Sequence, residues 1–198
     1  MRASTRCRAV VLGGLVLLGG CVGTPAPRPL AGHPPAALEG VKRFELTARI
    51  GVRYDGQGFF GGLRWHHGPN DDGLLLLSPL GQGVARIRRD GAGASLTTAS
   101  QQVFHAADAG SLMEAVLGWR LPLDGLPYWA LGEAAPGTSA NAQYGDDGRL
   151  KTLTQNGWRI TYGAFEPVGA LSLPESMVLS HGAHLEIRVV DARWSVGG

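Results

Sequence analysis

The feature that most restricts the fold is a strict alternation of apolar and polar residues that begins at Phe44. Residues 44–54 (FELTARIGVRY) place Phe44, Leu46 and Ile50 on one side and charged or small residues on the other. Alternation with a period of two over this length is typical of a β-strand with one buried face. The segment therefore predicts a strand that packs on a core along one side only.

Shorter segments with the same alternation recur along the chain and are separated by turns rich in Gly, Asp and Asn. The further predicted strands are residues 59–65, 74–77, 85–88, 158–162, 177–179, 185–189 and 194–196, with weaker signals at 94–98 and 102–106. Many short strands, each with one apolar face, indicate an antiparallel sheet that curls around its apolar side.

A helix is predicted between the two groups of strands. Residues 111–117 carry an apolar stripe, and either Asp108 or Ser111 can cap the helix. Ser111 and Glu114 have the spacing of a capping box, and Gly118 provides an end.

A second short helix is predicted to start near Asp124, cover residues 127–131 and end at Gly132, whereas residues 134–141 are expected to form a loop. The predicted fold class is therefore mainly β (α+β). It is a half-open, curved antiparallel β-barrel with short helices that cover the concave apolar face.

The first 20 residues have the composition of a secretory signal. Three arginines precede an apolar run at residues 9–18, which is too short to span a bilayer permanently. The run ends in Leu18-Gly19-Gly20-Cys21, which resembles a bacterial lipobox, the signal for acylation of Cys21 and cleavage before it. The alternative is an ordinary signal that is cleaved nearby, with Cys21 as a bystander.

This interpretation divides the chain into three parts. Residues 1–20 are a signal peptide of the lipoprotein type, residues 21–40 are the lipidated Cys21 and a Pro-rich tether, and residues 41–198 are a single domain. At roughly 3 Å per residue, the tether could reach about 45 Å. Because Cys7 and Cys21 are the two cysteines of the chain, no disulfide or cysteine metal site is expected in the domain.

The titratable residues do not form a recognisable catalytic arrangement. The two histidine pairs, His66 with His67 and His181 with His184, are interpreted as solvated turn residues, so no metal site, no cofactor and no enzyme activity are predicted. Arg86, Arg88 and Arg89 are read as a solvated strand face, with the docking of an acidic partner as the weaker alternative.

Charge argues against nucleic acid as a partner. The chain has 18 basic and 16 acidic residues, and removal of the three signal arginines would change the formal charge from +2 to −1. The sequence therefore predicts no basic surface of the kind that nucleic-acid binding needs.

Several stretches together resemble the LolB family, outer-membrane lipoproteins that receive other lipoproteins from a soluble periplasmic carrier. The matches are residues 44–52 (FELTARIGV), Leu63-Arg64-Trp65, residues 75–81 (LLLSPLG), residues 117–132 (LGWRLPLDGLPYWALG), Gln155-Asn156-Gly157-Trp158 with Tyr162, Leu173-Pro174 and Trp194. They follow the order of the family and cover nearly all of the predicted domain. Residues 133–143 match no pattern of the family.

The resemblance implies a half-open barrel that holds the acyl chains of lipoproteins and inserts them into the outer membrane. The implied partners are a LolA-like periplasmic carrier, acylated lipoprotein cargo and outer-membrane lipid, with a monomeric receptor anchored by lipid on the periplasmic face. Val22 follows Cys21, where an aspartate would favour retention in the inner membrane. The expected acyl-cavity lining is Leu46, Ile50, Val52, Leu63, Trp65, Leu75, Leu77, Trp119, Trp129, Trp158 and Ile160.

Pro79, Leu80 and Gly81 form a predicted tight turn with an apolar residue at its tip. In the LolB family the matching leucine protrudes and is needed to release cargo into the bilayer, so the resemblance implies a membrane-insertion loop here. A leucine that folds back onto the sheet is the alternative. Other functions that remain open are a periplasmic carrier of hydrophobic ligands and a structural envelope lipoprotein with a filled core, in which the tryptophans are plain core residues.

Overall fold

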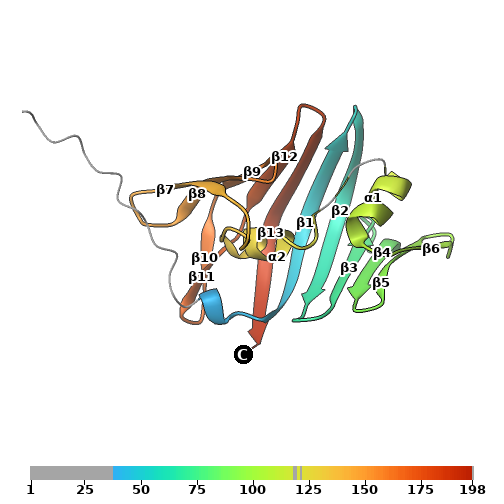
Figure 1. The fold of residues 1–198 in the computed structure, drawn as a ribbon, viewed down its shortest axis with the longest axis horizontal. Coiled ribbons are helices and arrows are strands. Elements are labelled where there is room, and N and C mark those ends of the chain that lie inside the picture. Colours follow the sequence, from blue (N-terminus) through green and yellow to red (C-terminus); the bar gives the residue numbers. More distant parts are fainter. Residues whose placement is uncertain (1–37, 118–119, 121, 198) are drawn as a thin grey trace, which may run out of the picture. The chain divides into compact units, whose positions relative to one another are not determined.

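A computed structural model describes residues 38–117, 120 and 122–197. Within this part, the chain forms an eleven-stranded antiparallel sheet and a separate two-stranded sheet (Figure 1). Two α-helices and one turn of 3-10 helix, Leu38–Gly40, complete the described elements. Among the helices that the structure describes, none is both long and apolar enough to cross a membrane. The predicted signal peptide, Cys21 and the tether up to residue 37 lie outside the described residues, and so does Trp119.

The strands and helices follow one another in a simple order. They are β1 (Arg43–Tyr54), β2 (Gln57–His67), β3 (Asp72–Leu77), β4 (Gly83–Asp90), β5 (Gly93–Thr98), β6 (Val103–Ala106), α1 (Ala109–Leu117), α2 (Leu126–Leu131), β7 (Ala140–Tyr144), β8 (Leu150–Gln155), β9 (Trp158–Tyr162), β10 (Phe165–Val168), β11 (Leu171–Pro174), β12 (Met177–His181) and β13 (Leu185–Gly197). In the large sheet the spatial order is β6-β5-β4-β3-β2-β1-β13-β12-β9-β8-β7, while β10 and β11 pair with each other.

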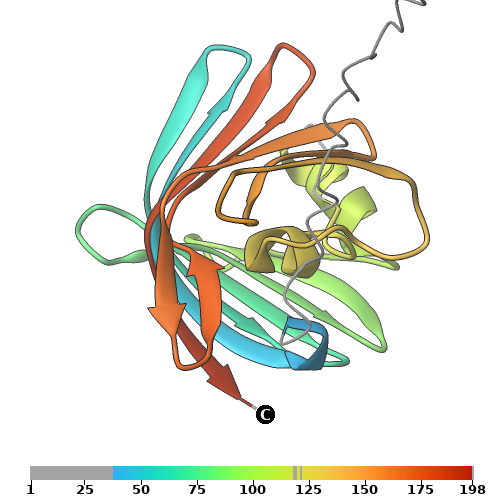
Figure 2. The ribbon, with the colours of Figure 1, turned by 90° about the vertical axis from the view of Figure 1, so that its left-hand side faces the viewer.

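The large sheet is strongly curved, and both helices lie on its concave side (Figure 2). In β1 the residues Phe44, Leu46, Ala48 and Ile50 are buried, whereas the intervening residues are exposed. The same alternation continues across the sheet, and its buried residues form one apolar core between the concave face and the helices. The predicted fold class is confirmed as a curved antiparallel sheet that stays open, because β6 and β7 are its two edges.

Each predicted strand corresponds to an observed one, but residues 185–189 and 194–196 belong to a single long strand, β13. The pairing of β13 with β1 shifts between Thr47 and Arg49, and Asp191 has a left-handed backbone with φ of 54°. This β-bulge adds one residue to β13 and interrupts its alternation. The interruption is why the sequence pattern predicts two strands instead of one.

Four strands, β7, β8, β10 and β11, were not predicted. In β8, Leu150 and Leu153 are both buried although they are three residues apart, because the pairing with β7 shifts at Gln143 and Tyr144. Strand β7 starts at Ala140, so the predicted loop over residues 134–141 ends earlier than expected. Small residues and an irregular register thus removed the period-two signal from this edge of the sheet.

Helix α1 is capped by Asp108. Its carboxylate accepts hydrogen bonds from the backbone N–H of Ser111 at 2.8 Å and from the Ser111 hydroxyl at 2.7 Å. These hydrogen bonds hold the pKa of Asp108 below its ordinary value. The predicted capping box is wrong, since Glu114 instead accepts a hydrogen bond from Arg120 Nε at 2.6 Å.

Helix α2 does not use Asp124 as its cap. Its N-cap is Gly125, with no side-chain hydrogen bond, and its C-cap is Gly132 in the left-handed region at φ of 85°. The end of the helix therefore agrees with the prediction, while Asp124 bonds a residue of the sheet, as described below.

Gly61 lies at a point where two strands approach each other closely. A Cβ atom at this position would overlap the carbonyl oxygen of Leu77 and contact the ring of Phe59. We expect Gly61→Ala to lower the free energy of unfolding by about 1–3 kcal/mol, because backbone would have to move. Urea unfolding measures the change. Gly51→Ala is the matched control, since a Cβ there meets nothing within 4 Å; equal effects of the two substitutions would contradict the prediction.

Candidate functional site

An apolar cavity of about 390 Å³ lies between the concave face and the two helices. A volume of this size falls within the range of binding sites for small hydrophobic ligands. Apart from Gln57 and the hydroxyl of Tyr54, the lining side chains are apolar. They are Ile50, Val52, Phe59, Leu63, Leu74, Leu76, Val84, Ala85, Ile87, Met113, Leu126 and Ile187.

The pairing of the strands explains which residues face the cavity. Leu63 of β2 lies opposite Leu76 of β3, and Leu76 lies opposite Ala85 of β4. Residues paired in this way project from the same face of an antiparallel sheet. Met113 of α1 and Leu126 of α2 complete the lining from the helical side.

Three residues predicted as cavity lining, Ile50, Val52 and Leu63, do line this cavity. Leu46 and Trp65 are buried in an aromatic cluster with Phe44, whose ring centroid is 4.9 Å from that of Trp65. They fill the core beside the cavity and are not among its lining residues.

Trp129, Trp158 and Ile160 are also buried in the core rather than in the lining of the cavity. The ring centroids of Trp129 and Trp158 are 6.1 Å apart, so α2 packs on this part of the sheet. For these residues, the interpretation as plain core fits the structure better than a role in lining a cavity.

The prediction that Leu75 and Leu77 line the cavity is wrong. They pair with Arg64 and Gly62 on the outer, convex face, while their neighbours Leu74 and Leu76 face inward. Four consecutive leucines carry no alternation, so the sequence of β3 alone does not reveal its buried face. Leu74 and Leu76 take the place of Leu75 and Leu77 in the lining.

Helix α2 is fixed to the sheet by buried hydrogen bonds. Trp129 Nε1 donates to Gln155 Oε1 at 2.8 Å, and the Tyr162 hydroxyl donates to the carbonyl oxygen of Trp129 at 2.8 Å. Burial of this hydroxyl raises the pKa of Tyr162, so it remains a donor. Gln155 also accepts from the N–H of Ala135 at 2.9 Å and donates to the carbonyl oxygen of Ala135 at 2.8 Å.

Replacement of Gln155 by leucine should therefore destabilise the attachment of α2. The substitution leaves the buried N–H groups of Trp129 and Ala135 without an acceptor, and we expect a loss of about 2–3 kcal/mol in the free energy of unfolding. Urea unfolding measures the total loss, and hydrogen exchange of α2 locates it. Gln143→Leu, at an exposed position of β7, is the control; protection of α2 that is unchanged in Gln155→Leu would contradict the prediction.

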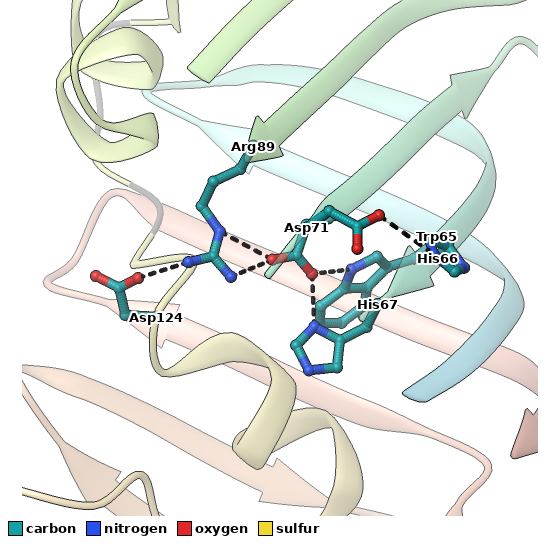
Figure 3. Close-up of polar contacts among 7 residues, drawn as sticks. Trp65, His66, His67, Asp71, Arg89 and Asp124 are labelled. Carbon is teal, nitrogen blue, oxygen red and sulfur yellow. Dashed lines mark hydrogen bonds and ion pairs between the residues drawn. The ribbon is translucent and has the colours of Figure 1, made fainter. Parts of the chain in front are cut away.

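A polar cluster lies on the same side of the sheet, where β2, β3 and β4 meet (Figure 3). The buried carboxylate of Asp72 accepts hydrogen bonds from Trp65 Nε1 at 3.0 Å and Arg89 Nε at 2.9 Å, and His67 Nδ1 lies 2.7 Å from it. Arg89 Nη2 makes a further contact with the carboxylate. Sequence reasoning missed this cluster, because its members come from three strands.

Arg89 also connects the sheet to the segment before α2. Its Nη1 lies 3.1 Å from Oδ1 of Asp124, so one guanidinium binds two carboxylates. Burial alone raises the pKa of Asp72, but the hydrogen bonds from His67, Arg89 and Trp65 outweigh this effect and lower it. The carboxylate is therefore ionised at neutral pH.

The polar cluster corrects two predictions. Arg89 does not belong to the solvated strand face with Arg86 and Arg88, since it pairs with buried Asp72. His67 joins the cluster, whereas His66 pairs with Asp71 at 3.3 Å, so the two histidines do not converge. Among the residues that the structure describes, no group of three or more His, Cys, Asp or Glu side chains could hold a metal ion.

The β3–β4 loop, residues 78–82, projects from the sheet on the side opposite the helices (Figure 2). The N–H of Gly81 donates to the carbonyl oxygen of Ser78 at 2.8 Å, and Gly81 has φ of 80°. This closed turn holds Leu80 outward, and the residue is 88% exposed. The alternative in which Leu80 folds back onto the sheet is therefore wrong for this structure.

The protein is an open antiparallel sheet, and its concave face and helices enclose an apolar cavity. These features define a class of half-barrels that are suited to hydrophobic ligands. Comparison with known proteins narrows this class. The family model described as "Outer membrane lipoprotein LolB" matches residues 42–194, and the chain belongs to this family.

Individual relatives agree with the family model. Outer-membrane lipoprotein LolB of Thiobacillus denitrificans is 41% identical over 177 residues, which cover 89% of this chain and 91% of the relative. The protein of the same name from Nitrosomonas europaea is 34% identical over an alignment of 199 positions, which covers 95% of this chain and 92% of the relative. The resemblance seen in the sequence is thus confirmed at the level of the family.

Solved structures with much lower identity share the fold. A LolA superfamily protein from Nitrosomonas europaea superposes with a TM-score of 0.50 at 10% identity, covering 80% of this chain and 88% of that protein. A protein of the DUF1329 family from Desulfovibrio piger gives a TM-score of 0.51 at 7% identity, covering 80% and 86%.

Proposed function

We propose that this protein is a receptor, anchored by lipid at Cys21 on the periplasmic face of the outer membrane. It accepts lipoproteins from a soluble carrier, binds their acyl chains in the apolar cavity, and passes them to the membrane without a cofactor. The observation that carries the proposal is the cavity on the concave face, in a chain that belongs to a family of outer-membrane lipoproteins.

The physical basis is the cost of exposing an acyl chain to water. Each buried CH₂ group contributes about 0.8 kcal/mol, so a chain of roughly sixteen carbons contributes on the order of 10 kcal/mol. Such a chain stays bound until another apolar environment receives it. Transfer from carrier to receptor then needs only a small difference in affinity. Every 1.4 kcal/mol of that difference changes the ratio of receptor-bound to carrier-bound cargo about tenfold.

The inward and outward residues of β3 provide a matched test of the cavity. Leu76→Glu puts a carboxylate into the lining, whereas Leu75→Glu puts the same charge on the outer face. We expect Leu76→Glu to reduce acceptance of cargo by on the order of tenfold, because the acyl chain would desolvate the carboxylate. Leu75→Glu should leave acceptance unchanged.

The assay mixes the purified protein with a carrier that holds a radiolabelled lipoprotein, in the absence of ATP, and measures how much cargo moves to the receptor. Circular dichroism establishes that both variants are folded. If no cargo moves to the wild-type protein, the receptor function is wrong. If Leu76→Glu accepts cargo as well as Leu75→Glu does, the cavity is not the binding site.

A further inference from the structure

Three exposed arginines share a groove on the outer face of the large sheet. Arg64 of β2 and Arg86 and Arg88 of β4 line this groove, which has a volume of about 350 Å³. In the part of the chain that the structure describes, none of the three has a carboxylate partner within ion-pair distance. Glu45, at the β1 side, is the one acidic residue in the lining of this basic groove.

The register of the strands places these positive charges in adjacent rows. Arg64 and Arg86 both lie opposite Leu75, one on each side, so about 10 Å separates their strands. Arg88 lies opposite Gly73, whose missing side chain leaves the space beside it open. Together the three arginines create a positive potential on this part of the surface, which attracts an anionic partner.

The basic groove and the root of the β3–β4 loop lie on the same outer face, because Leu75 in the groove and Leu77 at the loop are successive outward residues of β3. Next to it on the outer face is a hollow lined by Phe60, Leu77, Pro79 and Arg49, among others. Phe60 is 60% exposed, and the loop that carries Leu80 projects from this same side of the sheet (Figure 2). One face of the molecule therefore combines protruding apolar residues with arginines that lack acidic partners.

We propose that this outer face is a docking surface for an anionic lipid leaflet. The phosphates of lipid headgroups bind Arg64, Arg86 and Arg88, while Leu80 and Phe60 enter the boundary between headgroups and acyl chains. Exposed apolar side chains together with basic ones are the combination that binds peripheral proteins to anionic membranes. The inference rests on the proposed function in that the receptor works beside the outer membrane and passes its cargo to it.

The test uses the full mature chain with Cys21→Ser, so that no acyl anchor contributes to binding. Co-sedimentation is measured with vesicles of phosphatidylglycerol and phosphatidylcholine in equal parts, and with vesicles of phosphatidylcholine alone. The test variant is the triple substitution Arg64→Gln, Arg86→Gln and Arg88→Gln. The control variant, Arg120→Gln, Arg149→Gln and Lys151→Gln, removes the same charge from exposed positions away from the β1–β4 part of the outer face.

We expect the test variant to bind the anionic vesicles on the order of a hundredfold more weakly than the wild type, and the control to change little. Binding of the wild type should also weaken as salt is added. Equal loss in the two variants, or equal binding of the wild type to both kinds of vesicle, would overturn the proposal.

Transfer of cargo from the carrier is measured on the same proteins and tests the proposed function separately. A test variant that accepts cargo normally but binds vesicles poorly supports membrane docking. A variant that binds vesicles normally but accepts cargo poorly would assign the basic groove to an acidic surface of the carrier, and membrane docking would be wrong.

Discussion

Replacement of Leu80 by glutamate is expected to reduce insertion of cargo into a bilayer strongly while acceptance of cargo continues. Leu80 is 88% exposed at the tip of the β3–β4 loop and is not part of the core, so the fold should tolerate the change. A carboxylate is strongly disfavoured in the apolar part of a membrane. Insertion should therefore fall by at least about tenfold.

The separation of the two activities follows from their places on the sheet. The residues that line the cavity face the helices, whereas the loop projects from the other side (Figure 2). A liposome assay measures insertion, and transfer from loaded carrier measures acceptance. Val103→Glu, at a 53% exposed position of edge strand β6, controls for added charge, and Leu80→Met should restore insertion. Normal insertion by Leu80→Glu would contradict the assignment of this loop to membrane insertion.

Removal of the carboxylate of Asp72 is expected to be the most destabilising single substitution considered for this chain. In Asp72→Ala, Trp65 Nε1 loses its hydrogen-bond acceptor. Arg89 loses its buried carboxylate partner and keeps only the exposed Asp124. Breaking a buried charged pair from one side costs about 3–5 kcal/mol. Urea unfolding should show this loss, while Asp71→Ala, which removes only an exposed contact with His66, should cost less than about 1 kcal/mol.

The same carboxylate predicts how stability depends on pH. Because its pKa in the folded chain lies below the ordinary value of 3.8, the folded state binds the proton less readily than the unfolded state does. The stabilisation is therefore complete above that ordinary value and is lost as the pH falls through the folded pKa. The gap in unfolding free energy between wild type and Asp72→Asn should stay constant near neutral pH and shrink in acid; a gap that widens in acid would contradict this assignment.

The parts of the fold that could be predicted are the strands in which apolar and polar residues alternate without interruption. Strands β1 and β2 alternate regularly, and their buried faces follow directly from the sequence. Strand β3 was located correctly but assigned to the wrong face, because its four leucines are equivalent until pairing with β2 selects Leu74 and Leu76. Pairing between strands is a tertiary property that local patterns do not contain.

The polar contacts were not predictable for a related reason. Asp72 and Arg89 are 17 residues apart, and Trp129 and Gln155 are 26 residues apart. Each residue was visible in the sequence, and Gln155 lies in a stretch that resembles the LolB family. Their partners, however, are defined only once the strands and α2 have packed. The exposed Leu80 loop was predictable, since its turn is local to residues 78–82.

The placement of cavity and loop on opposite faces of one sheet has a consequence for the path of the cargo. The wall between them is a single layer of backbone joined by ladder hydrogen bonds, which an acyl chain cannot cross. An acyl chain that is bound in the cavity, as proposed, must therefore pass around an edge of the sheet to reach a leaflet on the outer face. Under the proposed function, docking on the bilayer and release of the acyl chain from the cavity are therefore two events at two locations, and each can be slowed without the other.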